Sequence, residues 1–427
     1  MGCGARLAGG TPVSTPSRAD FAAFDAADGL AGFRDRFVVD DENRIYADGN
    51  SLGRLPRATV EQLSAVTTEW GERLVTGWAD WIELPGRVGD RLAALLGAQS
   101  GEVLAADSTT VNLYKLAGAT VSVRAGAVLT DASEFPTDRY VLAGLAEQHD
   151  RELLLLESDP IEGVRPEDLA KACDGRDVAL VCLSHVSYRS GALADMRAIT
   201  EVAHNAGALV IWDLSHSAGA VPVRLGACGV DFAVGCSYKY LNAGPGSPAY
   251  LFVRSDLQEG LRSPIQGWFG QRDQFAMGTA YEPAPGIERF LAGTPPVLGL
   301  VAVAAGVELV LEAGDEALRE KSVALNQAAI TLHDAWLAPL GFELGSPRDP
   351  ERRGGHVSVR HLEAWRVCRG LIERDVVPDF RAPDSVRLGF PPLYSRFADV
   401  WDAFDRLRAL VESEDHLDVD PTPARVT

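Results

Sequence analysis

Short apolar segments alternate with helical segments along the middle of this chain, and this alternation limits the fold more than any other feature. Most of the apolar segments have no polar face, which is typical of strands buried on both sides in a parallel sheet. Helix signals lie between them, as at Met196–Asn205, which Gly207 follows. We therefore predict an α/β domain with a mainly parallel sheet covered by helices. The predicted strands are Ala127–Thr130, Glu152–Leu156, Val178–Ser184, Leu209–Asp213, Phe232–Gly235 and Tyr250–Val253.

The chain is also long enough for about two or three domains. A long helical stretch follows Pro296, and Gly341–Val411 mixes short strands with helices, which predicts a smaller α+β C-terminal domain. The first residues are rich in Gly, Pro and Ser, so we expect them to be disordered. The predicted organisation is a disordered N-terminus (1–18), an N-terminal segment packing with the small domain (19–65), a large domain (66–300), the small domain (301–411) and a loose tail (412–427).

The net charge of −20 repels phosphate backbones and anionic lipid. No apolar run reaches the ~18 residues of a membrane span, and the first residues lack the apolar core of a signal peptide. We therefore expect no nucleic-acid and no membrane partner. The six cysteines show neither a CxxC pair nor zinc spacing. This pattern predicts reduced thiols, a cytoplasmic location and no metal site.

Two apolar strands end in residues that can carry chemistry. The block Ile211–Ala220 passes from a strand into Asp213, and the block Asp231–Tyr240 passes from a strand into Lys239. Ligands bind at the carboxyl ends of the strands in an open α/β sheet, so both residues are expected at one rim. A pyridoxal phosphate (PLP) site needs this pair. The lysine forms a Schiff base with the cofactor, and the carboxylate keeps the pyridine nitrogen protonated.

Lysine is scarce, since the chain has only four. Lys171 and Lys321 lie in charged, helix-like contexts and are expected at the surface, where most lysines are found. Lys115 follows two threonines on a predicted helix. Lys239 alone ends an apolar strand, which favours a functional role over a solvated one.

The segment Ser237–Gly246 closely resembles the lysine motif of kynureninases, a family in the class V branch of the fold type I PLP enzymes. Asp213–Gly219 is similar to the family's Asp-Leu-Ala-His motif, with Ser215 where Ala is usual. The resemblance covers about residues 45 to 410 and implies a fold type I PLP-dependent transferase-like fold with PLP as cofactor. Further matching segments are Asp48–Gly53, Phe135–Asp138, Gly293–Pro296, Val386–Arg387 and Pro392–Tyr394.

The resemblance assigns cofactor contacts to individual residues. Thr109 and Thr110 would bind the phosphate, because hydroxyl and N–H groups at a helix start suit a dianion, although an ordinary helix N-cap is the alternative. Phe135 would cover the pyridine ring, and Tyr238 would contact the phosphate and shuttle protons. The implied catalytic residues are Lys239, Asp213 and Tyr238. The implied cofactor contacts are Thr109, Thr110, Phe135, Asp138, Ser184, Asp213, His216, Tyr238, Lys239, Trp268 and Thr294.

Substrate contacts follow in the same way. Arg387 would bind the substrate carboxylate with its guanidinium fork. Asn50, Ser51 and Trp78 are implied as further substrate-binding residues. Trp268 and Thr294 resemble phosphate contacts that reach in from a neighbouring subunit, which implies a homodimer with shared active sites.

The implied activity is the PLP-dependent hydrolysis of L-kynurenine to anthranilate and L-alanine, in tryptophan catabolism or a related biosynthetic pathway. A second candidate substrate is 3-hydroxy-L-kynurenine. Gly293–Pro296 and Trp78 resemble the type frequent in bacteria, which prefers kynurenine.

Two alternatives remain. The first is another class V activity, a desulfurase or lyase or an aminotransferase. A desulfurase needs a mobile cysteine well after the lysine, and only Cys368 is there, inside the helical pattern Leu362–Leu371. The second is a catalytically silent PLP-fold binding protein, which is expected to lack Lys239, Asp213 or Arg387. All three are present.

Overall fold

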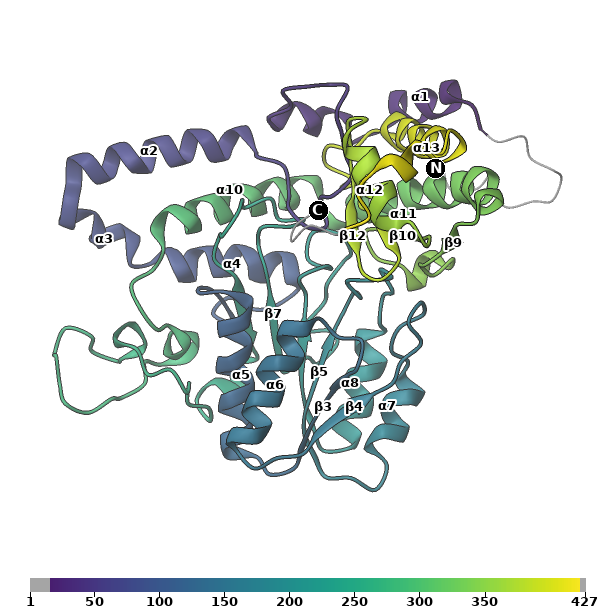
Figure 1. Ribbon diagram of the computed structural model, residues 1–427. Coiled ribbons are helices and arrows are strands. Elements are labelled where there is room, and N and C mark those ends of the chain that lie inside the picture. The colour runs from purple at the N-terminus through teal and green to yellow at the C-terminus, as the bar shows by residue number, and fades with distance from the viewer. Residues whose placement is uncertain (1–15, 423–427) are drawn as a thin grey trace.

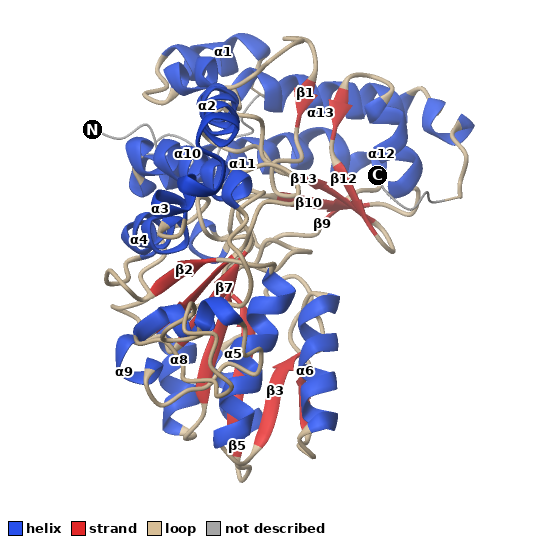
Figure 2. Ribbon diagram, turned by 90° about the vertical axis from the view of Figure 1, so that its left-hand side faces the viewer, coloured by secondary structure: helices blue, strands red, loops and turns tan. Residues whose placement is uncertain are grey.

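The computed structural model describes residues 16–422. A large α/β part lies beside a smaller part that joins N-terminal to C-terminal segments (Figures 1 and 2). The large part contains a seven-stranded sheet in the order β2-β8-β7-β6-β5-β3-β4. The strands from β7 to β4 are parallel, whereas β8 is antiparallel to both β7 and β2. The strands are β2 (Val103–Ala105), β3 (Ala127–Asp131), β4 (Leu153–Leu156), β5 (Val178–Ser184), β6 (Leu209–Asp213), β7 (Phe232–Gly235) and β8 (Tyr250–Val253).

Helices cover both faces of this sheet, as expected for strands that are apolar on each side. Successive residues of a strand enter different cores, as Ile211 and Trp212 do. One core is completed by helices α5 and α6, and the other by α4, α7, α8 and α10. The helices of this part are α2 (Arg57–Arg73), α3 (Trp78–Trp81), α4 (Leu84–Leu96), α5 (Thr109–Val123), α6 (Pro136–Gln148), α7 (Pro166–Cys173), α8 (Met196–Asn205), α9 (Ser255–Gln258) and α10 (Val297–Ala313).

The predicted mainly parallel α/β architecture is confirmed. Strands β5 to β8 have the bounds expected from the sequence, and β3 is one residue longer. Strand β2 was not expected, because an apolar run of only three residues does not stand out between two helices.

The smaller part contains a four-stranded antiparallel sheet in the order β12-β13-β10-β9. The N-terminal segment joins it, because β1 pairs in parallel with β11 and helix α1 packs on α13. The elements are α1 (Arg18–Ala26), β1 (Ile45–Tyr46), α11 (Asp315–Leu332), β9 (Glu343–Leu344), β10 (Val357–Arg360), α12 (Ala364–Ile372), β11 (Val376–Val377), β12 (Asp379–Arg381), β13 (Ser385–Leu388) and α13 (Phe397–Glu412).

The helix α10 belongs with the large part. Its buried residues Leu300, Val303 and Val310 lie in the same core as α4. Gly314 follows α10 with a φ of +78°, a conformation that favours glycine, and redirects the chain into α11. The boundary expected after residue 300 therefore lies inside a helix, and we propose to place it at Gly314.

Most of the expected disordered N-terminus, residues 1–15, lies outside the described residues. At its end, Ser17 forms a capping box with Asp20 at the start of α1, so the described part of the chain is helical from Arg18. The tail from 412 is not loose as far as Asp420. His416 is 5% exposed, and Trp365 Nε1 donates to the Asp420 carbonyl at 2.9 Å. Residues 423–427 again lie outside the described range.

No single helix within residues 16–422 has the length and apolarity needed to cross a membrane. Only α10 combined with the following stretch Asp315–Leu340 has both, and the two are bent by 82°.

Candidate active site

The carboxyl ends of the parallel strands gather several of the predicted residues. Asp213 is the last residue of β6, and the register places Ser184, at the end of β5, directly beside it. Glu134 and Asp138 follow the end of β3 on the next strand of the sheet. Side chains that end neighbouring parallel strands lie at one edge, so these four carboxyl and hydroxyl groups share the rim that the sequence predicted.

Lys239 reaches this rim from the loop after β7. Its Nζ lies 2.9 Å from Nε2 of His216, which follows β6. His216 is buried, and burial followed by the charge of Lys239 holds the pKa of this imidazole well below its usual value. His216 is therefore neutral and accepts a hydrogen bond from the lysine amine.

The other three lysines are each held by a carboxylate. Lys115 is buried and pairs with Asp107, and Lys171 is exposed at 3.7 Å from Asp168. Lys321 is buried and lies 2.7 Å from Asp28, so the expectation of a surface position was wrong. Within residues 16–422, Lys239 is the one lysine for which no carboxylate partner is found, which suits an amine that must react.

A buried carboxyl pair lies beside Lys239. Asp138 is 1% exposed and hydrogen-bonds to Asp213. Burial first, and then the charge of Asp213, raises the pKa of Asp138 well above its usual value. Asp138 is therefore the protonated partner. The Asp213 carboxyl also accepts from the backbone N–H of Ser215 at 2.7 Å, a bond that any residue at 215 can make, so Ser215 in place of Ala does not disturb it.

Glu134 is a rim residue that the sequence analysis missed. It is 5% exposed and accepts from the backbone N–H of Ser184 at 2.7 Å, from the Ser184 hydroxyl and from the Phe135 N–H at 3.1 Å. Burial raises its pKa to about 7. The available signal was its position, directly before the motif Phe135–Asp138 and just after a strand.

Arg387 lies on β13 of the small part and is 1% exposed. It pairs with Asp379 and donates to the Ser51 hydroxyl at 2.9 Å and to the Tyr188 carbonyl at 2.5 Å. Its charge contributes to the lowered pKa of His216, so the two parts of the molecule meet at one site. Asp379 was not expected from the sequence.

The residues around Arg387 leave hydrogen-bonding capacity unused. Asn50 is fully buried, and both polar atoms of its side chain lack a partner within the described structure. Nε of Arg387 is also buried without a hydrogen-bond partner within the described structure. A second unexpected residue, His356, is fully buried with its ring centroid 5.7 Å from that of His216. Buried polar groups are normally paired, so this region is suited to a polar ligand.

Two aromatic residues border the rim. Phe135 is 40% exposed and meets the ring of Tyr188 edge to face at 5.2 Å. The Lys239 ammonium lies 5.8 Å from the centre of the Tyr238 ring. Burial, with Cys236 and Asp213 nearby, raises the pKa of Tyr238, so this phenol stays protonated near neutral pH and has a proton to donate.

The expected phosphate and partner-subunit residues are more exposed than Asp138 and Asp213. Thr109 and Thr110 form the first turn of α5, where Ser108 caps the helix by accepting from Val111 N–H at 3.3 Å. Trp268 is 43% exposed, and Thr294 is also exposed. Within residues 16–422, Trp268 and Thr294 form no hydrogen bond with the rim residues.

Trp78 and Trp268 belong to one aromatic cluster around Phe269. The Phe269 ring centroid lies 6.4 Å from that of Trp78 and 4.4 Å from that of Trp268. Trp81 lies at 5.7 Å from Trp78 on the other side. Trp78, which was predicted to contact the aryl ring of the substrate, therefore lies in the same cluster as Trp268, which was predicted to reach the partner subunit's site.

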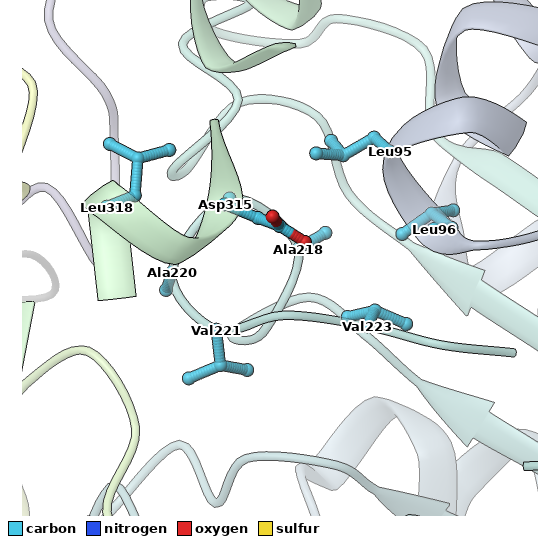
Figure 3. A pocket seen from close by; sticks show the side chains of 9 residues that line it. Leu95, Leu96, Ala218, Ala220, Val221, Val223, Asp315 and Leu318 are labelled. Atoms are coloured by element: carbon cyan, nitrogen blue, oxygen red, sulfur yellow. The ribbon is translucent and has the colours of Figure 1, made fainter. Parts of the chain in front are cut away.

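Two cavities lie outside this group of residues. One, of about 10 Å³, lies behind the loop after β6 and has room for about one water molecule. Figure 3 shows the apolar side chains that line it, among them Leu95, Ala218 and Val223. The other, of about 500 Å³, lies beside β9 and is lined by His333 and Arg348 among others. Lys239 and Asp213 line neither cavity. We therefore place the candidate active site at the strand ends and not in one of these cavities.

Comparisons with known proteins agree with this geometry. Residues 85–361 match the family model of class V aminotransferases, and residues 318–407 match that of the kynureninase C-terminal domain. The kynureninase of Pseudomonas fluorescens is 43% identical over 407 residues, which cover 93% of this chain and 96% of that protein.

Solved structures show the same fold at lower identity. The cysteine desulfurase CsdA of Escherichia coli is 18% identical, with a TM-score of 0.77 over 91% of this chain and 98% of that one. A variant of C-DES with glycine covalently linked to its PLP cofactor is 18% identical, with a TM-score of 0.75 over 92% and 99%. The chain belongs to the kynureninase family, within the class V aminotransferases.

Proposed function

We propose that this protein hydrolyses L-kynurenine to anthranilate and L-alanine with PLP as its cofactor. One observation carries the proposal. The amine of Lys239 lies 2.9 Å from a neutral imidazole, and its charge acts on Asp138, the hydrogen-bonded neighbour of Asp213. These residues follow the strand ends of a chain that belongs to the kynureninase family. This combination is what PLP chemistry on an amino acid requires.

The residues at the rim fit PLP. The polar atoms Oδ2 of Asp138 and Nδ1 of His216 are buried without a partner within the described structure, so the site has unused hydrogen-bonding capacity where the cofactor ring would lie. Phe135 leaves an exposed aromatic face to cover that ring. Asp213 would hold the pyridine nitrogen, and Lys239 the aldehyde carbon. Further contacts would come from Thr109, Thr110, Asp138, Ser184, His216 and Tyr238.

When bound, PLP supplies an electrophilic carbon for the substrate amine and a protonated ring that draws electron density from the substrate Cα. The residues of the chain do the rest. Arg387 binds the α-carboxylate, for which its Nε is available, and Asn50 and Ser51 lie beside it. Lys239 takes the proton from Cα. Tyr238 gives a proton during the addition of water to the γ-carbonyl, because its raised pKa keeps it in the donor form.

The alternative activities are less well supported. A desulfurase uses a mobile thiolate, whereas Cys368 is fully buried in α12, and burial raises the pKa of its thiol. A silent binding protein would not need Lys239, Asp213 and Arg387 together. All three lie in one electrostatically connected site here.

The substrate is a small molecule, and we further propose a homodimer with shared active sites. Exposed apolar side chains support the dimer: Trp268 is 43% exposed, Phe275 67% and Met277 74%. They lie on the segment between η4 (Trp268–Gly270) and η5 (Gly286–Phe290), which extends from the body of the molecule beside α3 (Figure 1). A surface of this kind usually meets a partner. We also propose a cytoplasmic location, which agrees with the free cysteines Cys173, Cys182, Cys228, Cys236 and Cys368.

The direct test is incubation of the PLP-loaded protein with L-kynurenine, with anthranilate followed by fluorescence and alanine measured separately. We expect both products in equal amounts. The Lys239→Ala protein serves as the control and should give neither. A second incubation uses cysteine in place of L-kynurenine. Release of sulfide from cysteine, or no product from either cysteine or L-kynurenine, would contradict the proposal.

A further inference from the structure

Glu134 joins two segments of the rim that the sequence keeps 50 residues apart. Its backbone lies in the turn after β3, and its carboxyl oxygens accept from both the N–H and the hydroxyl of Ser184, at the end of β5. The same carboxyl group accepts from the N–H of Phe135, the first residue of the motif that contains Asp138. One side chain therefore fixes Phe135 and Ser184 relative to each other.

We propose that Glu134 is a positioning residue for the cofactor. It fastens the loop that carries Phe135 and Asp138 to the end of β5, and when ionised it adds a negative charge beside that of Asp213. The inference rests on the proposed binding of PLP at this rim. It goes beyond that proposal, because it assigns a role to a residue that the proposal leaves without one.

The electrostatic surroundings make the charge of Glu134 sensitive to pH near neutrality. Its pKa is raised from 4.5 to about 7, by burial first and also by the charge of Asp213. Below this pH the carboxyl is neutral, and above it the group adds a negative charge to the rim. The titratable groups that interact electrostatically with it are Asp138 on α6, Cys182 on β5 and Asp213 on β6. The neighbouring elements also carry Asp131 on β3, His185 after β5 and Lys239 after β7.

The raised pKa of Glu134 also makes the stability of the folded protein depend on pH. Between pH 4.5 and about 7 the folded protein binds a proton that the unfolded chain has released. The contribution of Glu134 to stability therefore falls as the pH rises through this range. Glutamine in its place stays neutral and removes this dependence. Its one side-chain oxygen keeps an acceptor for the Ser184 N–H, while its NH2 group gives up the acceptor that the Phe135 N–H uses.

The experiment compares Glu134→Gln and Glu134→Ala with wild type and with Glu147→Gln, a control on the exposed face of α6. The full-length proteins are loaded with PLP, and the visible absorption band of the bound cofactor is followed from pH 5.5 to 9. We expect a transition near pH 7 in wild type and in the control, and none in Glu134→Gln. Thermal unfolding of the same proteins should lose stability between pH 4.5 and 7 more steeply in wild type than in Glu134→Gln.

The affinity for PLP separates charge from positioning. Glu134→Gln should bind PLP within about threefold of wild type, whereas Glu134→Ala should bind about tenfold more weakly, because it loses the hydrogen bonds to Ser184 and Phe135. Normal PLP uptake with an unchanged transition in Glu134→Gln would overturn the inference alone. Failure of wild type to take up PLP would instead overturn the proposed function, and this inference with it.

Discussion

The Nζ of Lys239 and the Nε2 of His216 are 2.9 Å apart, and the imidazole is the neutral partner. The imidazole thus orients the side chain of Lys239 without a carboxylate partner among the described residues. Lys115, Lys171 and Lys321 have such carboxylate partners. The reactive lysine is thus set apart from the others by its partner.

Covalent attachment of PLP should therefore occur at Lys239 alone. Borohydride reduction of the PLP-loaded protein, followed by peptide mapping, should find the label on the peptide that contains Lys239. Lys171 is the internal control, because it is the exposed lysine and would carry any nonspecific label. Label on Lys171 with none on Lys239 would contradict the assignment.

Replacement of Asp213 should impair turnover much more than binding. Asp213→Ala and Asp213→Asn remove the charge that keeps the pyridine nitrogen protonated. Only Asp213→Ala also removes the acceptor of the hydrogen bond from Asp138, because the asparagine oxygen can still accept it. We expect kcat to fall on the order of 100-fold, with a smaller change in KM. Steady-state kinetics with L-kynurenine measure both, and near-wild-type turnover would remove Asp213 from this role.

Arg387→Ala should lower kcat/KM for substrates with a free α-carboxylate, because a charge-assisted contact is lost. The loss of transition-state stabilisation should be about 2–4 kcal/mol. It also removes one partner of Asp379, which is buried, although Arg381 lies 3.0 Å from the same carboxylate. The control is the double change Arg387→Ala with Asp379→Asn. The double variant should be more thermally stable than Arg387→Ala but should have the same low kcat/KM. If both stability and kcat/KM returned to wild-type values, Arg387 would act through folding alone.

Features of the fold and of the site could be predicted where they depend on residues that are neighbours in the sequence. The strand ends that carry Asp213 and Lys239 were found, because apolar runs and the polar residues after them are visible in sequence. The buried position of Lys321 was not, since its partner Asp28 lies 293 residues away. Glu134 escaped for a similar reason. A glutamate before a phenylalanine is unremarkable until the sheet brings β3 and β5 side by side.

The domain boundary shows the same limit. The sequence predicts two helical segments from Val297 onward, Val297–Glu312 and Glu316–Leu337, but it does not reveal which part of the molecule each packs on. The packing of α10 against α4, and of α11 against α13, supports our proposal to place the boundary at Gly314.

Light scattering should find a homodimer. Trp268→Ala combined with Phe275→Ser should shift the protein towards monomer, because both side chains are exposed in the segment that we propose as the interface. Leu362→Ser is the matched control, since Leu362 is 94% exposed but lies in the small part on the loop before α12. A fully active monomer in wild type would refute shared active sites.

The aromatic cluster of Trp78, Trp81 and Phe269 leads to the last prediction, a preference for L-kynurenine over its 3-hydroxy analogue. Trp78 contributes an apolar ring, with neighbours at 5.7 and 6.4 Å that are aromatic as well. A hydroxyl on the substrate ring would lose water against these aromatic faces, which costs roughly 1–3 kcal/mol. We therefore expect kcat/KM for L-kynurenine to be higher by about tenfold or more. Trp78→His offers the hydroxyl a hydrogen-bonding group and should narrow this ratio, whereas Trp70→His, at a side chain 56% exposed on α2, should not. Side-by-side kinetics decide the matter. An equal or better rate with the 3-hydroxy substrate, together with an unchanged ratio in Trp78→His, would show that Trp78 only packs against Trp81 and Phe269 and does not select the substrate.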